Sequence, residues 1–240
     1  MDTATLTFPG DTTAATAAVP SCVRDGAIDP VRLLQDLIRF PTEHDCRGCV
    51  AYIADLLAHF GISSTRHVQQ EERPCLVARI AGRGSAPPLL LYGHVDVVPV
   101  AGQDWSVDPF AGLVRDGFVW GRGALDMKGG IAMLVTAFVA MHRTPPPGDV
   151  ILCIVSDEES GGQDGAQFLV DAHPELFHGV RHALGEFGGF SFDLFGKRFM
   201  PIQVDERRFV GITAQVVAAG GHAALGGTGN AAVVAAELVR

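Results

Sequence analysis

The sequence predicts an α/β protein with a mostly parallel sheet sandwiched by helices. Segments typical of strands alternate with segments typical of helices over residues 28–206, and this order is typical of parallel strands joined by crossover helices. Residues 88–98 and 150–155 are apolar nearly throughout, as expected of strands that are covered on both faces. Because 48% of the 240 residues are hydrophobic, the chain is expected to bury a large core.

Local signals place the individual elements. Asp29 followed by Pro30 is typical of a helix N-cap and first turn, so a helix is expected over residues 31–40. A second helix is expected to end at Gly61, and Asp116-Gly117 predicts the turn of a β-hairpin. The other expected elements are strands over residues 75–82, 88–98, 150–155, 182–187 and 209–221, and helices over residues 49–60, 129–142, 165–173 and 230–240.

The same pattern suggests a division into domains. Residues 1–27 are expected to form a disordered N-terminal tail, because they carry no sustained apolar pattern. Residues 28–206 are expected to form an incomplete catalytic α/β domain. The pattern changes after that point, and residues 207–240 look like the beginning of an α+β lid domain that cannot bury its own apolar faces.

Charge and composition exclude several function classes. The formal net charge is −9, with 27 acidic against 18 basic residues, which argues against nucleic acid or a membrane surface as a partner. The first residues lack the basic and apolar regions of a secretory signal, so a cytoplasmic location is expected. The five cysteines are scattered, and the pair Cys46 and Cys49 is interpreted as incidental rather than as a zinc or redox site.

Polar side chains follow several of the predicted strands. His94 and Asp96 lie near the end of one predicted strand, the acids Asp157, Glu158 and Glu159 follow another, and Glu186 lies near the end of a third; Asp126 precedes a helix. Because ligands bind at the carboxyl ends of strands in open α/β sheets, these side chains are expected to converge. One imidazole and several carboxylates form a donor set for a divalent cation.

Each of these residues also has an ordinary structural explanation. A single histidine at a strand end, an acid at a helix start and a pair of glutamates are usually structural or solvated. Their joint order and strand placement favour a metal site over an α/β domain without metal. The number of acids favours two ions rather than one, since a single catalytic zinc uses three protein ligands and a water.

The sequence contains three motifs in this order: GHVDVVP, GRGALDMKGG and SDEESGG. In them the chain resembles the dizinc amidohydrolases and peptidases that include aminoacylase, acetylornithine deacetylase, succinyl-diaminopimelate desuccinylase and carboxypeptidase G. The resemblance covers about residues 28–240 and implies a zinc-exopeptidase-like fold. Residues 185–227 look most like the aminoacylase and Gly-X carboxypeptidase branch.

The resemblance implies a role for each matching residue. The implied metal ligands are His94, Asp126, Glu159 and Glu186, with Asp126 bridging two Zn²⁺ ions, for which Co²⁺ or Mn²⁺ can substitute. Glu158 is implied as the general base and Asp96 as the carboxylate that orients His94. His222 matches a lid histidine that reaches the active site of a partner subunit. A cis peptide bond is implied after Asp126, and Asp157 is expected to be structural.

The implied activity is hydrolysis of an amide bond in an N-acyl amino acid or small peptide, by a hydroxide that bridges the zinc ions. Family members are longer, so the chain is expected to be truncated before a second metal-binding histidine, and Arg207 and Arg208 depart from the family's Glu-Lys-Gly. The alternative is a non-catalytic family member that keeps at most one zinc and serves as a binding or remnant protein. Homodimerisation through the lid is a further implication.

Overall fold

The computed structural model describes residues 20–186, 191–202, 213–217 and 231–238. The chain forms two compact units, residues 1–189 and residues 190–240. The predicted catalytic domain (28–206) and lid (207–240) stay predictions. Residues 1–19 of the predicted disordered tail lie outside the described residues. Residues 20–27, in contrast, are part of the fold, since Cys22 is fully buried and the short strands β1 (Val23–Arg24) and β2 (Ala27–Ile28) pair.

A five-stranded sheet forms the centre of the first unit, in the order β3-β4-β8-β5-β9. Its strands are β3 (Ser64–His67), β4 (Cys75–Ile80), β5 (Leu89–His94), β8 (Val150–Val155) and β9 (His182–Leu184). The predicted α/β class is confirmed, but the sheet is mixed rather than mostly parallel. Strand β5 is parallel to both β8 and β9, whereas β4 is antiparallel to β3 and β8. The connection between β3 and β4 is too short for a parallel crossover.

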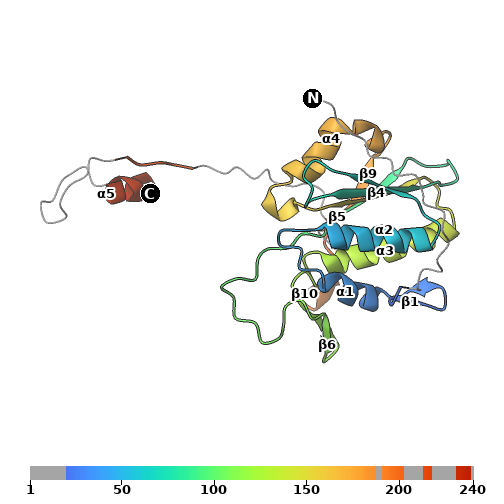
Figure 1. Ribbon diagram of the computed structural model, residues 1–240, viewed down its shortest axis with the longest axis horizontal. Coiled ribbons are helices and arrows are strands. Elements are labelled where there is room, and N and C mark those ends of the chain that lie inside the picture. Colours follow the sequence, from blue (N-terminus) through green and yellow to red (C-terminus); the bar gives the residue numbers. More distant parts are fainter. Residues whose placement is uncertain (1–19, 187–190, 203–212, 218–230, 239–240) are drawn as a thin grey trace, which may run out of the picture. The chain divides into compact units, whose positions relative to one another are not determined.

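Helices cover both faces of this sheet (Figure 1). One face carries α1 (Pro30–Ile38), α2 (Arg47–His59) and α3 (Lys128–Arg143), which share one core with inward side chains of β4, β5 and β8. The other face is covered by α4 (Phe168–Ala172) and the short helices around it, and it has a smaller core. The short helices are η1 (Glu158–Ser160), η2 (Gln163–Gln167) and η3 (Pro174–Phe177).

The local signals of the sequence fix where elements begin and end. The Oδ1 atom of Asp29 accepts hydrogen bonds from two backbone N–H groups of the first turn of α1, which confirms the predicted cap. Helix α2 is followed by Gly61 at φ +74°, a conformation that favours glycine. Strands β6 (Leu113–Arg115) and β7 (Phe118–Trp120) form the predicted hairpin around Asp116-Gly117.

The second unit contains the hairpin of β10 (Phe192–Leu194) and β11 (Lys197–Phe199) and the helix α5 (Ala231–Leu238). Helix α5 confirms the element expected over residues 230–240. The strand expected over residues 209–221 is wrong where it is described, because residues 213–217 form no strand; its other residues lie outside the described part. Strand β3 and the β10–β11 hairpin were not predicted.

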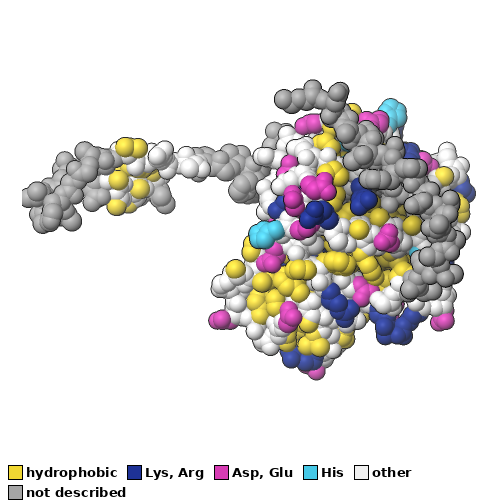
Figure 2. Space-filling view, in the orientation of Figure 1, with side chains coloured by type: hydrophobic (Ala, Val, Ile, Leu, Met, Phe, Trp, Pro, Cys, Tyr) yellow, Lys and Arg dark blue, Asp and Glu magenta, His cyan; other side chains and the backbone are white. Residues whose placement is uncertain are grey.

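The surface agrees with the charge of the sequence. On the described face shown in Figure 2, Lys and Arg side chains are scattered among Asp and Glu rather than gathered into one basic patch. None of the helices in the described ranges is long and apolar enough to cross a membrane.

Candidate metal centre

Three neighbouring strands deliver the predicted ligands to one edge of the sheet. His94 is the last residue of β5 and lies opposite Val155, the last residue of β8. The acids at 157–159 follow β8, and Glu186 follows β9, which is parallel to β5. Because these three strands run in the same direction, their carboxyl ends lie together.

The imidazole of His94 is the centre of the cluster. It is fully buried, and its Nε2 atom lies 3.1 Å from Asp126 Oδ1. The same Nε2 atom lies 3.7 Å from Glu158 Oε2 and 3.7 Å from Glu186 Oε2. Asp126 comes from the turn before α3, and its peptide bond to Met127 is cis, as the resemblance implied.

The ligand atoms form two overlapping groups. One contains His94, Asp126 and Glu186, and the other contains His94, Glu158 and Glu159; within each group the donor atoms lie within 4.8 Å of one another. The first group is the set that the resemblance implied for one ion. In the second group Glu159 is near His94 rather than near a further histidine, and within the described ranges His94 supplies the imidazole of both groups.

Asp96 lies behind His94 and connects it to the acidic turn. The Nδ1 atom of His94 lies 3.0 Å from the Asp96 backbone oxygen and 3.4 Å from its Oδ1 atom. The backbone N–H groups of Glu158 and Glu159 donate to Asp96 Oδ1 and Oδ2, at 3.2 and 3.0 Å. One carboxylate that is 1% exposed therefore faces the histidine and also anchors two of the acids.

The pKa values of these groups reflect a crowded set of acids. Burial lowers the pKa of His94, but the carboxylates of Asp96 and Glu158 outweigh it and raise this pKa to about 9. Burial and the neighbouring Asp126 raise the pKa of Glu186 to about 7. The pKa of Glu159 is also raised, by burial and then by Asp126. Burial and repulsion between neighbouring carboxylates therefore both disfavour the charged forms of Glu159 and Glu186.

The donor set fits a divalent cation. Zinc ligands lie about 2.0–2.2 Å from the ion, so two ligands of one ion lie within about 4 Å of each other, and these donor atoms are close to that spacing without rearrangement. Nitrogen and carboxylate oxygen suit Zn²⁺ and its usual substitutes. A cation would also relieve the repulsion that raises the pKa values of Glu159 and Glu186.

Other predicted residues have different outcomes. Asp157 is 2% exposed, and its Oδ2 atom accepts a hydrogen bond from the Asp164 backbone at 2.6 Å, which agrees with the structural role expected for it. His222, Arg207 and Arg208 lie outside the described residues. Cys46 and Cys49 are buried free thiols, and neither belongs to a metal-ligand group found among the described residues.

Sequence reasoning missed Arg73. Its Nη1 atom donates to the backbone oxygen of Ser156 at 2.9 Å and lies 3.9 Å from Asp96 Oδ2. Arg73 lies in the loop between β3 and β4, outside the three motifs and far from them in sequence. The cluster of acids in the motifs indicates that a positive charge is needed nearby, but it does not identify the residue that provides it.

Comparisons with known proteins agree with the geometry. The family model described as peptidase family M20/M25/M40 matches residues 90–223. Succinyl-diaminopimelate desuccinylase of Cereibacter sphaeroides is 42% identical over 147 residues, which is 60% of this chain and 38% of that protein. The desuccinylase of Methylobacterium radiotolerans is 41% identical over 150 residues, 59% of this chain and 38% of that protein.

Solved structures show the same fold. Human carnosine dipeptidase 1 matches with a TM-score of 0.56 at 23% identity, over 65% of this chain and 37% of that one. An M20 family metallo-carboxypeptidase from Sulfolobus solfataricus matches with a TM-score of 0.56 at 19% identity, over 66% and 37%. This chain spans less than two fifths of the length of the curated relatives it matches. Since the family model covers more than half of the chain, the chain belongs to peptidase family M20/M25/M40.

Proposed function

We propose that this chain carries the catalytic residues of a metal-dependent hydrolase that cleaves the amide bond of an N-acyl amino acid or small peptide. The observation that supports this most is the position of Glu158, whose carboxylate lies 3.7 Å from the buried Nε2 atom of His94 and is 42% exposed. A carboxylate with this access can contact both the metal site and a substrate.

In this proposal His94, Asp126, Glu159 and Glu186 hold the metal, as one or two Zn²⁺ ions. When bound, a divalent cation supplies a lowered pKa for water and polarisation of a carbonyl group. Asp96 keeps the His94 ring in place through the Nδ1 side. Glu158 accepts the proton of the attacking water and returns it to the leaving amine.

The comparisons also support the proposed substrate class. The curated relatives are named succinyl-diaminopimelate desuccinylase, which favours an N-acyl amino acid, with an N-succinyl group among the acyl groups to be tested. The dipeptidase and carboxypeptidase likenesses are below 25% identity and support the fold alone. Three further points also stay proposals. They are membership of the narrower aminoacylase branch, a homodimer through residues 207–240 in which His222 reaches the partner's active site, and a cytoplasmic location.

The test is zinc per chain, measured by elemental mass spectrometry after exchange into chelator-free buffer, together with turnover of N-acetyl and N-succinyl amino acids and dipeptides. We expect bound zinc and amide cleavage, and Glu158→Gln is expected to keep the zinc and lose about 10²-fold or more of the turnover. Glu175→Gln is the matched control, because that carboxylate is 69% exposed and contacts His173 instead. A folded protein with at most one zinc and no turnover would instead support the non-catalytic alternative.

A further inference from the structure

Asp96 is a buried carboxylate that connects several parts of the metal centre. Its two oxygens accept the Glu158 and Glu159 N–H groups, and Oδ1 also faces His94 Nδ1. A carboxylate that is 1% exposed needs compensation for its lost hydration. Two backbone amides provide part of this compensation, and a cation nearby would provide more.

Arg73 is one such cation. Among the residues that the structure describes, it is the Lys or Arg side chain that forms an ion pair with Asp96, with Nη1 3.9 Å from Oδ2. The arginine side chain is only 14% exposed, so solvent screens this pair weakly. At 3.9 Å the contact is electrostatic rather than a hydrogen bond, and the hydrogen bond of Nη1 goes to the Ser156 carbonyl instead.

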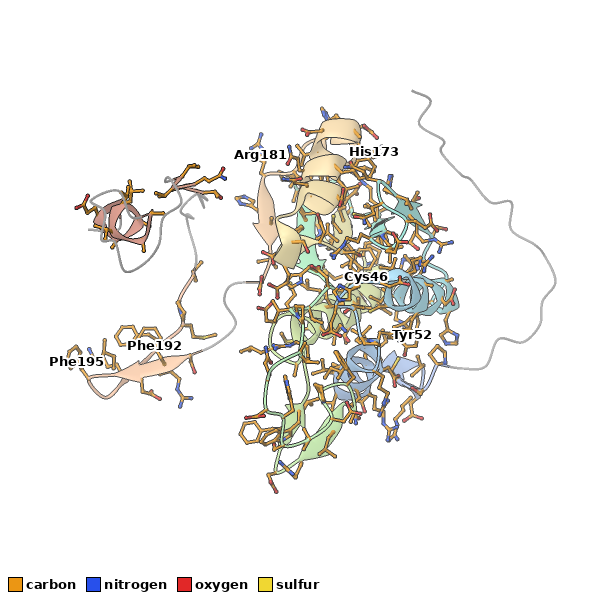
Figure 3. All side chains as sticks on the ribbon, turned by 60° about the vertical axis from the view of Figure 1, so that its left-hand side comes forward. Cys46, Tyr52, His173, Arg181, Phe192 and Phe195 are labelled. Carbon is orange, nitrogen blue, oxygen red and sulfur yellow. The ribbon has the colours of Figure 1, made fainter. Side chains whose placement is uncertain are left out.

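The loop that carries Arg73 is itself fixed to the end of β8. The Ser156 hydroxyl donates to the Pro74 backbone oxygen at 2.6 Å, and the Cys46 N–H donates to the Glu72 oxygen at 2.8 Å. The Cys46 thiol also contacts the Ser156 oxygen, at 3.7 Å. Figure 3 shows Cys46 inside the molecule, beside α2. The residues on either side of Arg73, Glu72 and Pro74, are therefore fixed by hydrogen bonds, and Pro74 is bound to Ser156, the residue directly before the acidic turn.

We propose that Arg73 is a positioning residue that holds Asp96 and the end of strand β8, and through them sets the geometry of the metal ligands. Within the described part of the chain its ion pair is with Asp96 and its hydrogen bond with Ser156, and neither residue is a proposed metal ligand. Its charge stabilises the Asp96 carboxylate, and its hydrogen bond fixes Ser156, the residue before the three acids. The consequence for catalysis rests on the proposed metal-dependent hydrolysis, whereas the positioning of Asp96 does not.

The test compares Arg73→Met and Arg73→Lys with Arg79→Met in the full chain. Arg79 is a matched control, since it forms a more exposed ion pair with Asp149 at 2.8 Å, on strand β4 and away from the metal centre. Zinc affinity is measured by competition with a chelator. We expect Arg73→Met to weaken zinc binding about 10–100-fold, the range typical for residues that support metal ligands. Arg73→Lys is expected to recover part of this loss, because it keeps the charge beside Asp96, and Arg79→Met to lose none.

A second measurement needs no metal. Hydrogen exchange of the Glu158 and Glu159 amides, followed by NMR on the metal-free protein, reports the two hydrogen bonds to Asp96. We expect roughly tenfold faster exchange in Arg73→Met and a smaller change in Arg73→Lys. Unchanged exchange together with unchanged zinc affinity would overturn the positioning role while leaving the proposed hydrolysis intact. Faster exchange in a protein whose wild type binds no divalent metal would support the positioning role and reject the hydrolysis.

Discussion

The Nε2 atom of His94 lies 3.1 Å from the Oδ1 atom of Asp126, although 32 residues separate the two in sequence. One ends strand β5 and the other precedes helix α3. Since Glu158 and Glu186 approach the same nitrogen, the imidazole is the one donor common to both ligand groups. The geometry of the centre thus depends on His94 more than on any single carboxylate.

Replacing His94 by Ala is therefore expected to weaken metal binding strongly. The loss in zinc affinity should exceed about 100-fold, the upper range for a residue that only supports a ligand. His142→Ala is the control, because His142 lies near the end of α3 and is exposed. Chelator competition measures both variants. Equal affinity of His94→Ala and wild type would show that the metal binds elsewhere.

A side chain at Gly93 is expected to push the ends of two buried side chains aside. A Cβ atom at this position would lie 2.7 Å from Ile131 Cδ1 and 2.7 Å from Met127 Cε. These atoms are the ends of side chains and can shift, but Met127 is 1% exposed and directly follows Asp126, so Gly93→Ala should disturb the packing beneath this ligand. We expect the free energy of unfolding to fall by about 1–3 kcal/mol, measured by urea denaturation, and zinc affinity to fall with it.

Gly185→Ala provides the matched comparison for that change. Gly185 precedes the predicted ligand Glu186 as Gly93 precedes His94, but the nearest atoms to a Cβ there belong to Tyr92 and lie at 3.8 Å or more, an ordinary contact distance. Its stability is expected to remain within about 0.5 kcal/mol of wild type. A similar loss in both variants would show that crowding at Gly93 is not the cause.

The fold follows largely from signals within a few residues of each element. The Asp29 cap and the turn at Asp116-Gly117 are local in this sense, because each needs only its own backbone to form. The strand-end positions of His94 and Glu186 also follow from local patterns. Their convergence follows from parallel pairing, which the strand–helix alternation predicts.

Features that depend on distant partners could not be predicted in this way. Strand β3 is Ser-Thr-Arg-His at an edge of the sheet, without the apolar alternation that identifies a strand, and it exists because it pairs with β4. Arg73 belongs to the same class. Its role depends on Asp96 and Ser156, which are distant in sequence, and a single arginine in a polar loop carries no signal of them.

Stability is expected to fall as the pH rises above about 9. Burial raises the pKa of all five cysteine thiols, to about 12 for Cys46, about 11 for Cys49 and about 12 for Cys153. Thiols of the unfolded chain ionise near pH 8.5–9. Above that pH the folded state therefore binds more protons than the unfolded state, so the free energy of unfolding decreases.

Each thiol contributes at most about 1.4 kcal/mol per pH unit to this decrease. Burial lowers the pKa of Lys128, which acts in the opposite direction, but it is one group against five thiols, and the raised pKa of His94 adds to the decrease below about pH 9. Urea denaturation between pH 7.5 and 9.5 gives the slope. Cys49→Ala should make the slope shallower whatever it does to stability at pH 7.5. An unchanged slope in this variant would mean that the Cys49 thiol ionises in the folded protein as it does in the unfolded one.

The three adjacent acids are expected to have three different roles. Glu158 is the proposed general base and Glu159 a proposed metal ligand, whereas the role of Asp157 is expected to be structural. Its side chain is 2% exposed and accepts the N–H of Asp164, at the beginning of the segment η2. Asp157→Ala removes the acceptor and leaves the partly buried N–H group of Asp164 without this partner, so the free energy of unfolding should fall by about 1–3 kcal/mol. Asp157→Asn keeps an acceptor oxygen and should lose less. The zinc affinity of both folded Asp157 variants should stay near that of the wild type. Glu159→Gln is the comparison and is expected to bind zinc more weakly. A large loss of zinc in Asp157→Asn would assign the first of the three acids to the metal instead.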